Sequence, residues 1–161
     1  MFRRLILPAA FLTLAACGPS SPTEPAAPAA PTVPPPTAAQ MQAALAALPA
    51  PYDGADLDNG RRVFARCRSC HTVTANGPNM TGPNLYGVFG RQAGTHAGYR
   101  YSAPVKAAGF AWDAERIDHW LENPRTFLPG NKMTFPGIAD PTDRRDLIAW
   151  LQVSTTPAPA A

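Results

Sequence analysis

Residues 64–73 read FARCRSCHTV, with Cys67 and Cys70 three positions apart and His71 directly after the second cysteine. Such a motif could form a disulfide, supply half of a zinc site, act as a dithiol redox centre or anchor a haem. A disulfide across two residues closes a very small loop and removes little chain entropy. A tetrahedral zinc site needs two further Cys or His ligands, and no second cysteine pair follows.

The surroundings of the motif favour the last of these four interpretations. A thioredoxin-like dithiol belongs in a βαβ setting, and no convincing strand pattern lies on either side. CxxCH is the attachment signature of c-type haem, in which two thiols one helical turn apart add to the two vinyl groups. We therefore predict one covalently attached haem c, held by Cys67 and Cys70, with His71 as an iron ligand.

The second axial position of the iron separates electron carriers, which fill it, from peroxidases and gas sensors, which leave it open or weak. The candidate ligands of the mature chain are Met41, Met80, Met133, His96 and His119. Met80 follows His71 by only nine residues, and Met41 lies in an Ala/Pro-rich stretch. Met133 lies in the loop FLPGNKMTFPG, where Pro and Gly bracket an irregular backbone. Met133 is the predicted second ligand.

The first sixteen residues have the layout of an export signal. Arg3 and Arg4 precede an apolar run of about twelve residues, whereas a membrane-spanning helix needs roughly 20. The junction LAACG resembles a bacterial lipoprotein cleavage site, which predicts that Cys17 is lipidated and becomes the first mature residue. The alternative is a conventional signal peptide with an incidental cysteine. Residues 17–51 are then a lipid anchor and an Ala/Pro-rich linker, within which 38–48 could form a short helix.

Aromatic and charged residues reach the density of a globular domain only from Tyr52 onward. This part carries 12 basic and 10 acidic residues, a balance that does not suggest nucleic-acid binding. We predict a haem domain over residues 52–154 and a disordered tail over 155–161. Because c-type haem is attached outside the cytoplasm, the domain is expected in the periplasm, anchored to the cell membrane.

Helix signals within the domain predict an all-α fold of about four to five short helices around the haem. Acidic residues open three of them: Asp56 and Asp58 lie at the start of one helix, and Asp113 and Asp140 are the N-cap candidates of the other two. The second of these helices is expected to end at Asn123-Pro124, and 102–108 is a further, less regular candidate. Gly60 and Phe64 share one helical face, so that the glycine would let another helix approach and Phe64 could stack near Trp150.

Together these blocks resemble a class I cytochrome c of the mitochondrial type over about residues 56–152. The resemblance rests on G-x-x-x-F before the haem motif, CRSCHTV, TGPNLYGVFGRQAG, Y-S with Trp112, LENPRTFLPGNKMTF and DLIAWL. It implies that Cys67 and Cys70 are the thioether residues and that His71 and Met133 are the axial ligands. Three further roles follow from it. The Pro83 carbonyl would accept the outer ring N–H of His71, and Phe135 would cover the haem near Met133. A haem propionate would be held or shielded by Arg91, Tyr101 and Trp112.

Two positions depart from the family pattern: Trp120 stands where a tyrosine is frequent, and Val105 where an asparagine is frequent. The resemblance implies a one-electron carrier of a respiratory or photosynthetic chain, not an enzyme. Expected partners are a cytochrome bc-type complex and a terminal oxidase or reaction centre, met by a basic face of Arg66, Arg68, Arg125 and Lys132. The alternatives are a haem enzyme or sensor with a weak sixth ligand, and a fixed haem subunit of an oxidase. We expect a monomer that contacts the membrane through its lipid anchor.

Overall fold

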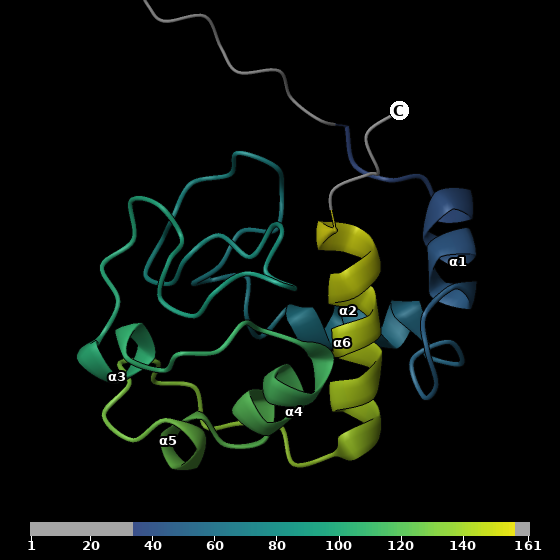
Figure 1. Cartoon of the computed structure of the whole chain (residues 1–161). Coiled ribbons are helices and arrows are strands. Elements are labelled where there is room, and N and C mark those ends of the chain that lie inside the picture. The colour runs from purple at the N-terminus through teal and green to yellow at the C-terminus, as the bar shows by residue number, and fades with distance from the viewer. Residues whose placement is uncertain (1–33, 157–161) are drawn as a thin grey trace, which may run out of the picture.

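The computed structural model describes residues 34–156 (Figure 1). Within that range lie six helices: α1 (Ala38–Ala46), α2 (Leu57–Phe64), α3 (Ala103–Lys106), α4 (Ala114–Glu122), α5 (Pro124–Phe127) and α6 (Pro141–Thr155). Over the same residues there is no strand, and the one isolated β-bridge joins Gln92 and Ala111. The predicted all-α fold is confirmed, with six helices where about four to five were expected. No helix of residues 34–156 is both long and apolar enough to cross a bilayer.

The two predicted N-caps, Asp113 and Asp140, are both made by side chains, and Asp56 caps a third helix in the same way. Asp56 accepts from the backbone N–H of Asn59, and Asp113 from that of Arg116. Asp140 accepts from the second and third N–H groups of α6, which Pro141 opens. Each carboxylate satisfies donors that the first helical turn leaves without partners, and it lies at the positive end of the helix dipole.

Helix α5 was not predicted. The chain leaves α4 at Glu122, as expected before a proline, but Pro124 starts a new short helix at once. The Asn123 side chain accepts from the backbone N–H of Thr126, and proline suits the first helical position because its missing N–H would have no helical partner there. The same dipeptide therefore ends one helix and begins the next.

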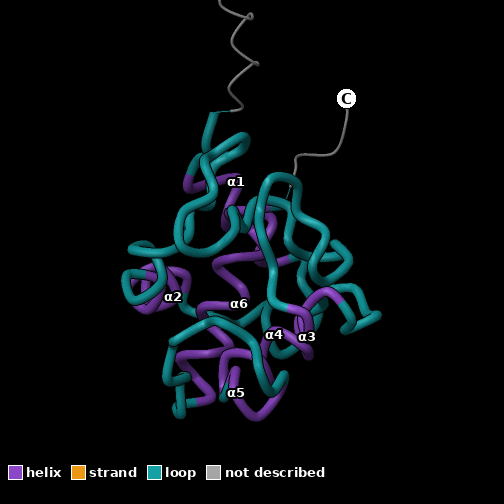
Figure 2. The backbone as a smooth tube through the Cα atoms, turned by 90° about the vertical axis from the view of Figure 1, so that its left-hand side faces the viewer, coloured by secondary structure: helices purple, strands orange, loops and turns teal. Residues whose placement is uncertain are grey.

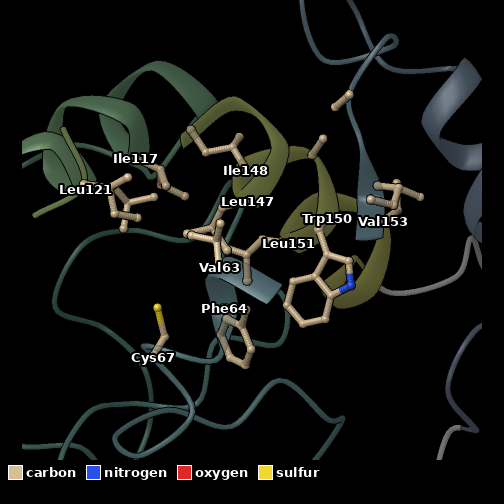
Figure 3. Packing of buried hydrophobic residues seen from close by; sticks show 14 of the residues in the cluster. Val63, Phe64, Cys67, Ile117, Leu121, Leu147, Ile148, Trp150, Leu151 and Val153 are labelled. Carbon is tan, nitrogen blue, oxygen red and sulfur yellow. The ribbon is translucent and has the colours of Figure 1, made fainter. Parts of the chain in front are cut away.

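The core is built where α2 crosses α6 (Figure 3). At the crossing a Cβ on Gly60 would lie 2.2 Å from the carbonyl oxygen of Asp146, so only glycine allows this approach. One turn further along α2, the ring of Phe64 lies 4.8 Å from that of Trp150, centroid to centroid. Both predictions about this helical face are confirmed. Ile117 and Leu121 of α4 complete the cluster from the other side.

A buried carboxylate joins the same two helices. Asp146 of α6 is 1% exposed, and its oxygens accept from the backbone N–H of Asp56 at 3.1 Å and the Asn59 amide at 3.0 Å. The guanidinium of Arg145 donates to it at 2.7 Å. Because a buried charge is tolerated only when it is paired and hydrogen-bonded, these contacts lock the start of α2 against α6.

Helix α1 lies within the predicted linker, so the folded part begins before residue 52. Thr37 and Gln40 form a reciprocal capping box at its start. A helix of nine residues is marginal alone, but Leu45 is buried and packs with Met41 and Leu48 against the core beside α6. In Figure 1, α1 lies on one side of α6, and the long helix-free segment 65–102 lies on the other. Figure 2 shows how loops make up most of the face opposite α1.

Candidate haem site

One cavity of about 370 Å³ opens between the helices and the irregular segments 65–102 and 128–137. Its volume lies in the range of cofactor sites. All nine site residues predicted within the described chain line it: Cys67, Cys70, His71, Pro83, Arg91, Tyr101, Trp112, Met133 and Phe135. The tenth, Cys17, lies outside the described residues. The fold thus gathers in one place residues that are spread over 69 positions of the chain.

The two cysteines lie on a helical turn that continues from α2. The backbone N–H groups of Cys70 and His71 both donate to the carbonyl of Cys67, each at 3.0 Å. Both cysteines are free, with Cys67 buried and Cys70 half-buried. Burial raises the pKa of the Cys67 thiol to about 11, against the lowering effect of the Arg66 cation. The cavity wall therefore carries two cysteine side chains one helical turn apart, the spacing that attachment to two vinyl groups needs.

The imidazole of His71 is held from two sides. Its Nδ1 lies 2.7 Å from the carbonyl oxygen of Pro83, the contact that the resemblance implied. Because a carbonyl only accepts, Nδ1 carries the ring proton and Nε2 keeps its lone pair for a metal. Burial lowers the pKa of His71, and the Pro83 carbonyl opposes this less strongly. The ring packs against Gly82, where a Cβ would lie 2.3 Å from Cε1.

Of the five candidate second ligands, only Met133 lines the cavity with His71. Met80 is 45% exposed and absent from the wall, and Met41 lies on α1. The Met133 loop is fixed at its far end, where the N–H of Ile138 donates to the carbonyl of Leu121 at 2.8 Å. A thioether and a neutral imidazole in one apolar cavity are the two donors that a haem iron would need.

A polar corner of the cavity suits the carboxylates of a haem. Arg91 donates to the carbonyls of Tyr86 and Asn84, each at 3.1 Å, and its Nη1 lies 2.9 Å from Nδ1 of His96. Burial lowers the pKa of Arg91, so the cation would gain from an anionic neighbour. In the wall of the same cavity, the hydroxyl of Ser102 is buried without a partner in the described structure. A half-buried guanidinium and an orphaned hydroxyl are the groups that a propionate would satisfy.

Aromatic rings form much of the remaining wall. The predicted Trp112 packs edge-on against Trp120, with ring centroids 5.5 Å apart, and against Phe110 at 5.0 Å. Trp120 and Val105, the two positions that depart from the family pattern, both line the cavity. A wall of this kind excludes water and matches the apolar faces of a macrocycle, so the residues present fit a haem.

Two of the four predicted docking cations also hold the site together. The guanidinium of Arg66 donates to the carbonyl of Gly137 at 3.1 Å and lies over the Phe135 ring, 5.1 Å from its centroid. The ammonium of Lys132 donates to the carbonyl of Arg100 and lies 4.6 Å from the centre of the Tyr99 ring. Arg68 and Arg125 are exposed, as Arg66 and Lys132 are.

The cavity wall also contains residues to which the sequence analysis gave no role in the site, among them Tyr99, Ser102 and Asn131. Tyr99 donates its hydroxyl to the carbonyl of Thr81, which also lines the cavity, at 2.6 Å. The run YRYS at 99–102 was a usable signal for two of them, since it places aromatic and hydroxyl groups beside the predicted Tyr101. No pattern in the sequence pointed to Asn131.

Comparisons with known proteins agree with this geometry. The family model for cytochrome c matches residues 57–155, and the chain belongs to the cytochrome c family. Cytochrome c of Guizotia abyssinica is 46% identical over 101 residues, which cover 62% of this chain and 91% of that one. Cytochrome c of Kluyveromyces lactis is 41% identical over 105 residues, which cover 65% of this chain and 96% of that one.

A solved structure gives the same result. Cytochrome cH from Methylobacterium extorquens superposes with a TM-score of 0.58 and 40% sequence identity, covering 62% of this chain and 99% of that one. The chain is therefore an electron-transfer protein with one covalently attached haem c, and not an enzyme. Helix α1 precedes the region that the family model matches.

Proposed function

We propose that the chain is a membrane-tethered one-electron carrier of a respiratory or photosynthetic chain, with its haem domain in the periplasm. The observation that supports it most is that Met133 alone among the candidate ligands shares the cavity with His71. Bound haem supplies one-electron exchange between Fe(II) and Fe(III), at a potential that a Met/His ligand pair holds high. The chain's own residues bind, orient and shield that group.

Each role is assigned to a named contact. Cys67 and Cys70 would form the thioether bonds, and His71, oriented by Pro83, would offer Nε2 to the iron. Arg91 and Tyr101, with Ser102 beside them, would hold the propionates, while Trp112 and Phe135 keep water out. Because two filled axial positions leave no open site for a substrate, this set supports electron transfer.

We propose a cytochrome bc-type complex as donor and a terminal oxidase or reaction centre as acceptor. The exposed cations Arg66, Arg68, Arg125 and Lys132 would orient docking, but 12 basic against 10 acidic residues from Tyr52 onward give little long-range steering. A lipid anchor at Cys17 would compensate, since tethering raises the effective concentration without any new contact.

Helix α1 shortens the proposed tether. With α1 packed beside α6, only residues 18–36 remain between Cys17 and the cap of that helix. At roughly 3.1 Å per residue in the extended polyproline conformation, this stretch reaches about 60 Å at most. The haem domain would thus work within a thin layer beside the membrane.

Replacing Met133 with alanine is expected to abolish the weak thioether-to-iron charge-transfer band at the red end of the visible spectrum. The reduction potential should fall by on the order of 0.1 V or more, because the Met ligand favours Fe(II). Absorption spectra and redox titration of the purified haem-loaded protein give both quantities. Met80→Ala is the matched control and should change neither, since Met80 is exposed and outside the cavity. A Met133→Ala protein that kept the band would refute the His/Met assignment.

Replacing Cys17 with serine is expected to move the protein from the membrane fraction to the soluble fraction, with its visible spectrum unchanged. The thiol at Cys17 is the proposed lipid acceptor, and two or more acyl chains give stable anchoring where one does not. Fractionation of cells, with haem absorbance as the label, measures the distribution. Ser20→Ala is the control and should remain membrane-bound. A Cys17→Ser protein that is processed but stays in the membrane would show that the anchor lies elsewhere.

A further inference from the structure

The side chain of Asn131 makes three hydrogen bonds, all to the backbone. Its Nδ2 donates to the carbonyl of Pro124 at 2.7 Å and to the carbonyl of Leu128 at 2.8 Å. Its Oδ1 accepts from the backbone N–H of Met133 at 2.8 Å. One carboxamide offers two N–H donors and one carbonyl, so both donors and the oxygen have partners.

The orientation of this amide follows from its partners. The Met133 N–H can only donate and the two carbonyls can only accept, so Oδ1 must face Met133 and Nδ2 must face the helix. Pro124 and Leu128 are the first residue and the C-cap of α5. Asn131 therefore connects both ends of α5 to the backbone of Met133, whose side chain lines the cavity.

Other contacts hold the far side of the Met133 loop. Arg66 binds Gly137 and covers Phe135, and Ile138 pairs with Leu121. Before Met133, the chain passes through the half-buried Asn131 and the exposed Lys132, and Asn131 makes the side-chain contacts to α5. On the near side, Lys132 bonds to the carbonyl of Arg100 and the backbone N–H of Asn131 to that of Leu128, but the Asn131 carboxamide alone among the side-chain contacts of the described residues joins α5 to the backbone of Met133.

We propose that Asn131 is the positioning residue for Met133: its three hydrogen bonds hold the backbone of Met133 so that the thioether stays in the cavity. The inference rests on the proposed His/Met ligation. It adds the side chain that would keep Met133 bound to the iron. A loop without this amide would release the thioether more often, and an external ligand would take its place more readily.

Imidazole added to the oxidised, haem-loaded protein measures this opening, because it binds only when Met133 has left. Asn131→Ala removes all three bonds and is expected to raise the imidazole affinity about tenfold or more, since each lost bond is worth roughly a factor of five or more. Asn131→Asp has almost the same shape, but it replaces Nδ2 with a carboxylate oxygen that faces the carbonyls of Pro124 and Leu128. It is expected to raise the affinity at least as much, whereas a role in packing alone would leave it near the wild-type value.

Asn123→Ala is the matched control, because it removes the N-cap of α5 without touching the Met133 loop. It is expected to lower the denaturant midpoint while leaving the imidazole affinity within about twofold of wild type. An affinity that rises equally in Asn123→Ala, or that stays unchanged in Asn131→Ala and Asn131→Asp, would overturn the proposal. A wild-type protein that lacks the thioether band would instead overturn the ligation itself, and this inference with it.

Hydrogen exchange covers the case in which the Asn131 variants fail to accumulate. In the wild-type protein the Met133 amide is expected to exchange at least about tenfold more slowly than an unprotected loop amide, because Oδ1 accepts its proton. Exchange at the unprotected rate would show that the bond does not persist, and would equally overturn the proposal.

Discussion

Replacing Gly60 with alanine is expected to destabilise the folded protein by about 3 kcal/mol or more. The new Cβ would lie 2.2 Å from the carbonyl oxygen of Asp146 and 2.7 Å from the Cβ of Trp150. Both atoms belong to the backbone or the first side-chain position of α6, so no rotamer change relieves the overlap and the two helices must separate. Alanine is the better helix former by about 1 kcal/mol, which is less than this cost.

Denaturant unfolding of the haem-loaded protein measures this loss. Domains of this size are stable by roughly 5–15 kcal/mol, so a change of 3 kcal/mol shifts the midpoint clearly. Gly54→Ala is the control, because a Cβ at Gly54 meets no atom within 4 Å, and its midpoint should stay near that of wild type. Equal midpoints for the two variants would mean that the helices do not cross as closely as described.

Replacing Gly82 with alanine is expected to displace the imidazole of His71. The Cβ would lie 2.3 Å from Cε1 and 2.7 Å from both ring nitrogens, so the ring must move away from its present plane. That movement breaks the 2.7 Å contact with the Pro83 carbonyl, which sets the tautomer that leaves Nε2 free. Overpacking costs about 1–3 kcal/mol and the lost hydrogen bond about 1 kcal/mol more.

Two measurements check the Gly82 variant. The yield of haem-loaded protein should fall, and the remaining holoprotein should show an altered reduction potential, because hydrogen bonding to the ligand imidazole tunes its basicity. Gly54→Ala again serves as the control and should match wild type in both. A Gly82→Ala protein with the wild-type spectrum and potential would show that the ring tolerates the methyl group, contrary to the packing described here.

Much of the site could be predicted because its signals are local. Cys67, Cys70 and His71 lie within five residues, and a single helical turn places them on one side of the cavity. The Pro and Gly residues around Met133 marked a rigid loop, and that loop does line the cavity. The N-caps Asp113 and Asp140 were recognisable because a cap acts on N–H groups only two or three residues ahead.

The missed features depend on contacts between distant parts of the chain. The helix-forming tendency of 38–46 was visible, but its packing beside α6 depends on Leu45 meeting a surface about a hundred residues further along. The importance of Ser102 depends on the fold, which buries its hydroxyl without a partner in the wall of the cavity that Arg91 also lines. The sequence does not distinguish Asp146 from the other charged residues of its helix. In the fold it is 1% exposed and accepts a hydrogen bond from the backbone N–H of Asp56 at the start of α2.

The sequence by itself determined the class of protein, the attachment motif and the starts of the main helices, since these depend on residue type and on spacings of a few positions. Only the tertiary structure decided that α1 packs beside α6, how closely α2 approaches α6 and where the tether begins. These outcomes depend on the packing of segments far apart in the chain, where a distance of an ångström separates contact from clash. Asn131 illustrates the difference: its neighbours in the sequence identify a loop, and only the fold shows that its amide holds Met133.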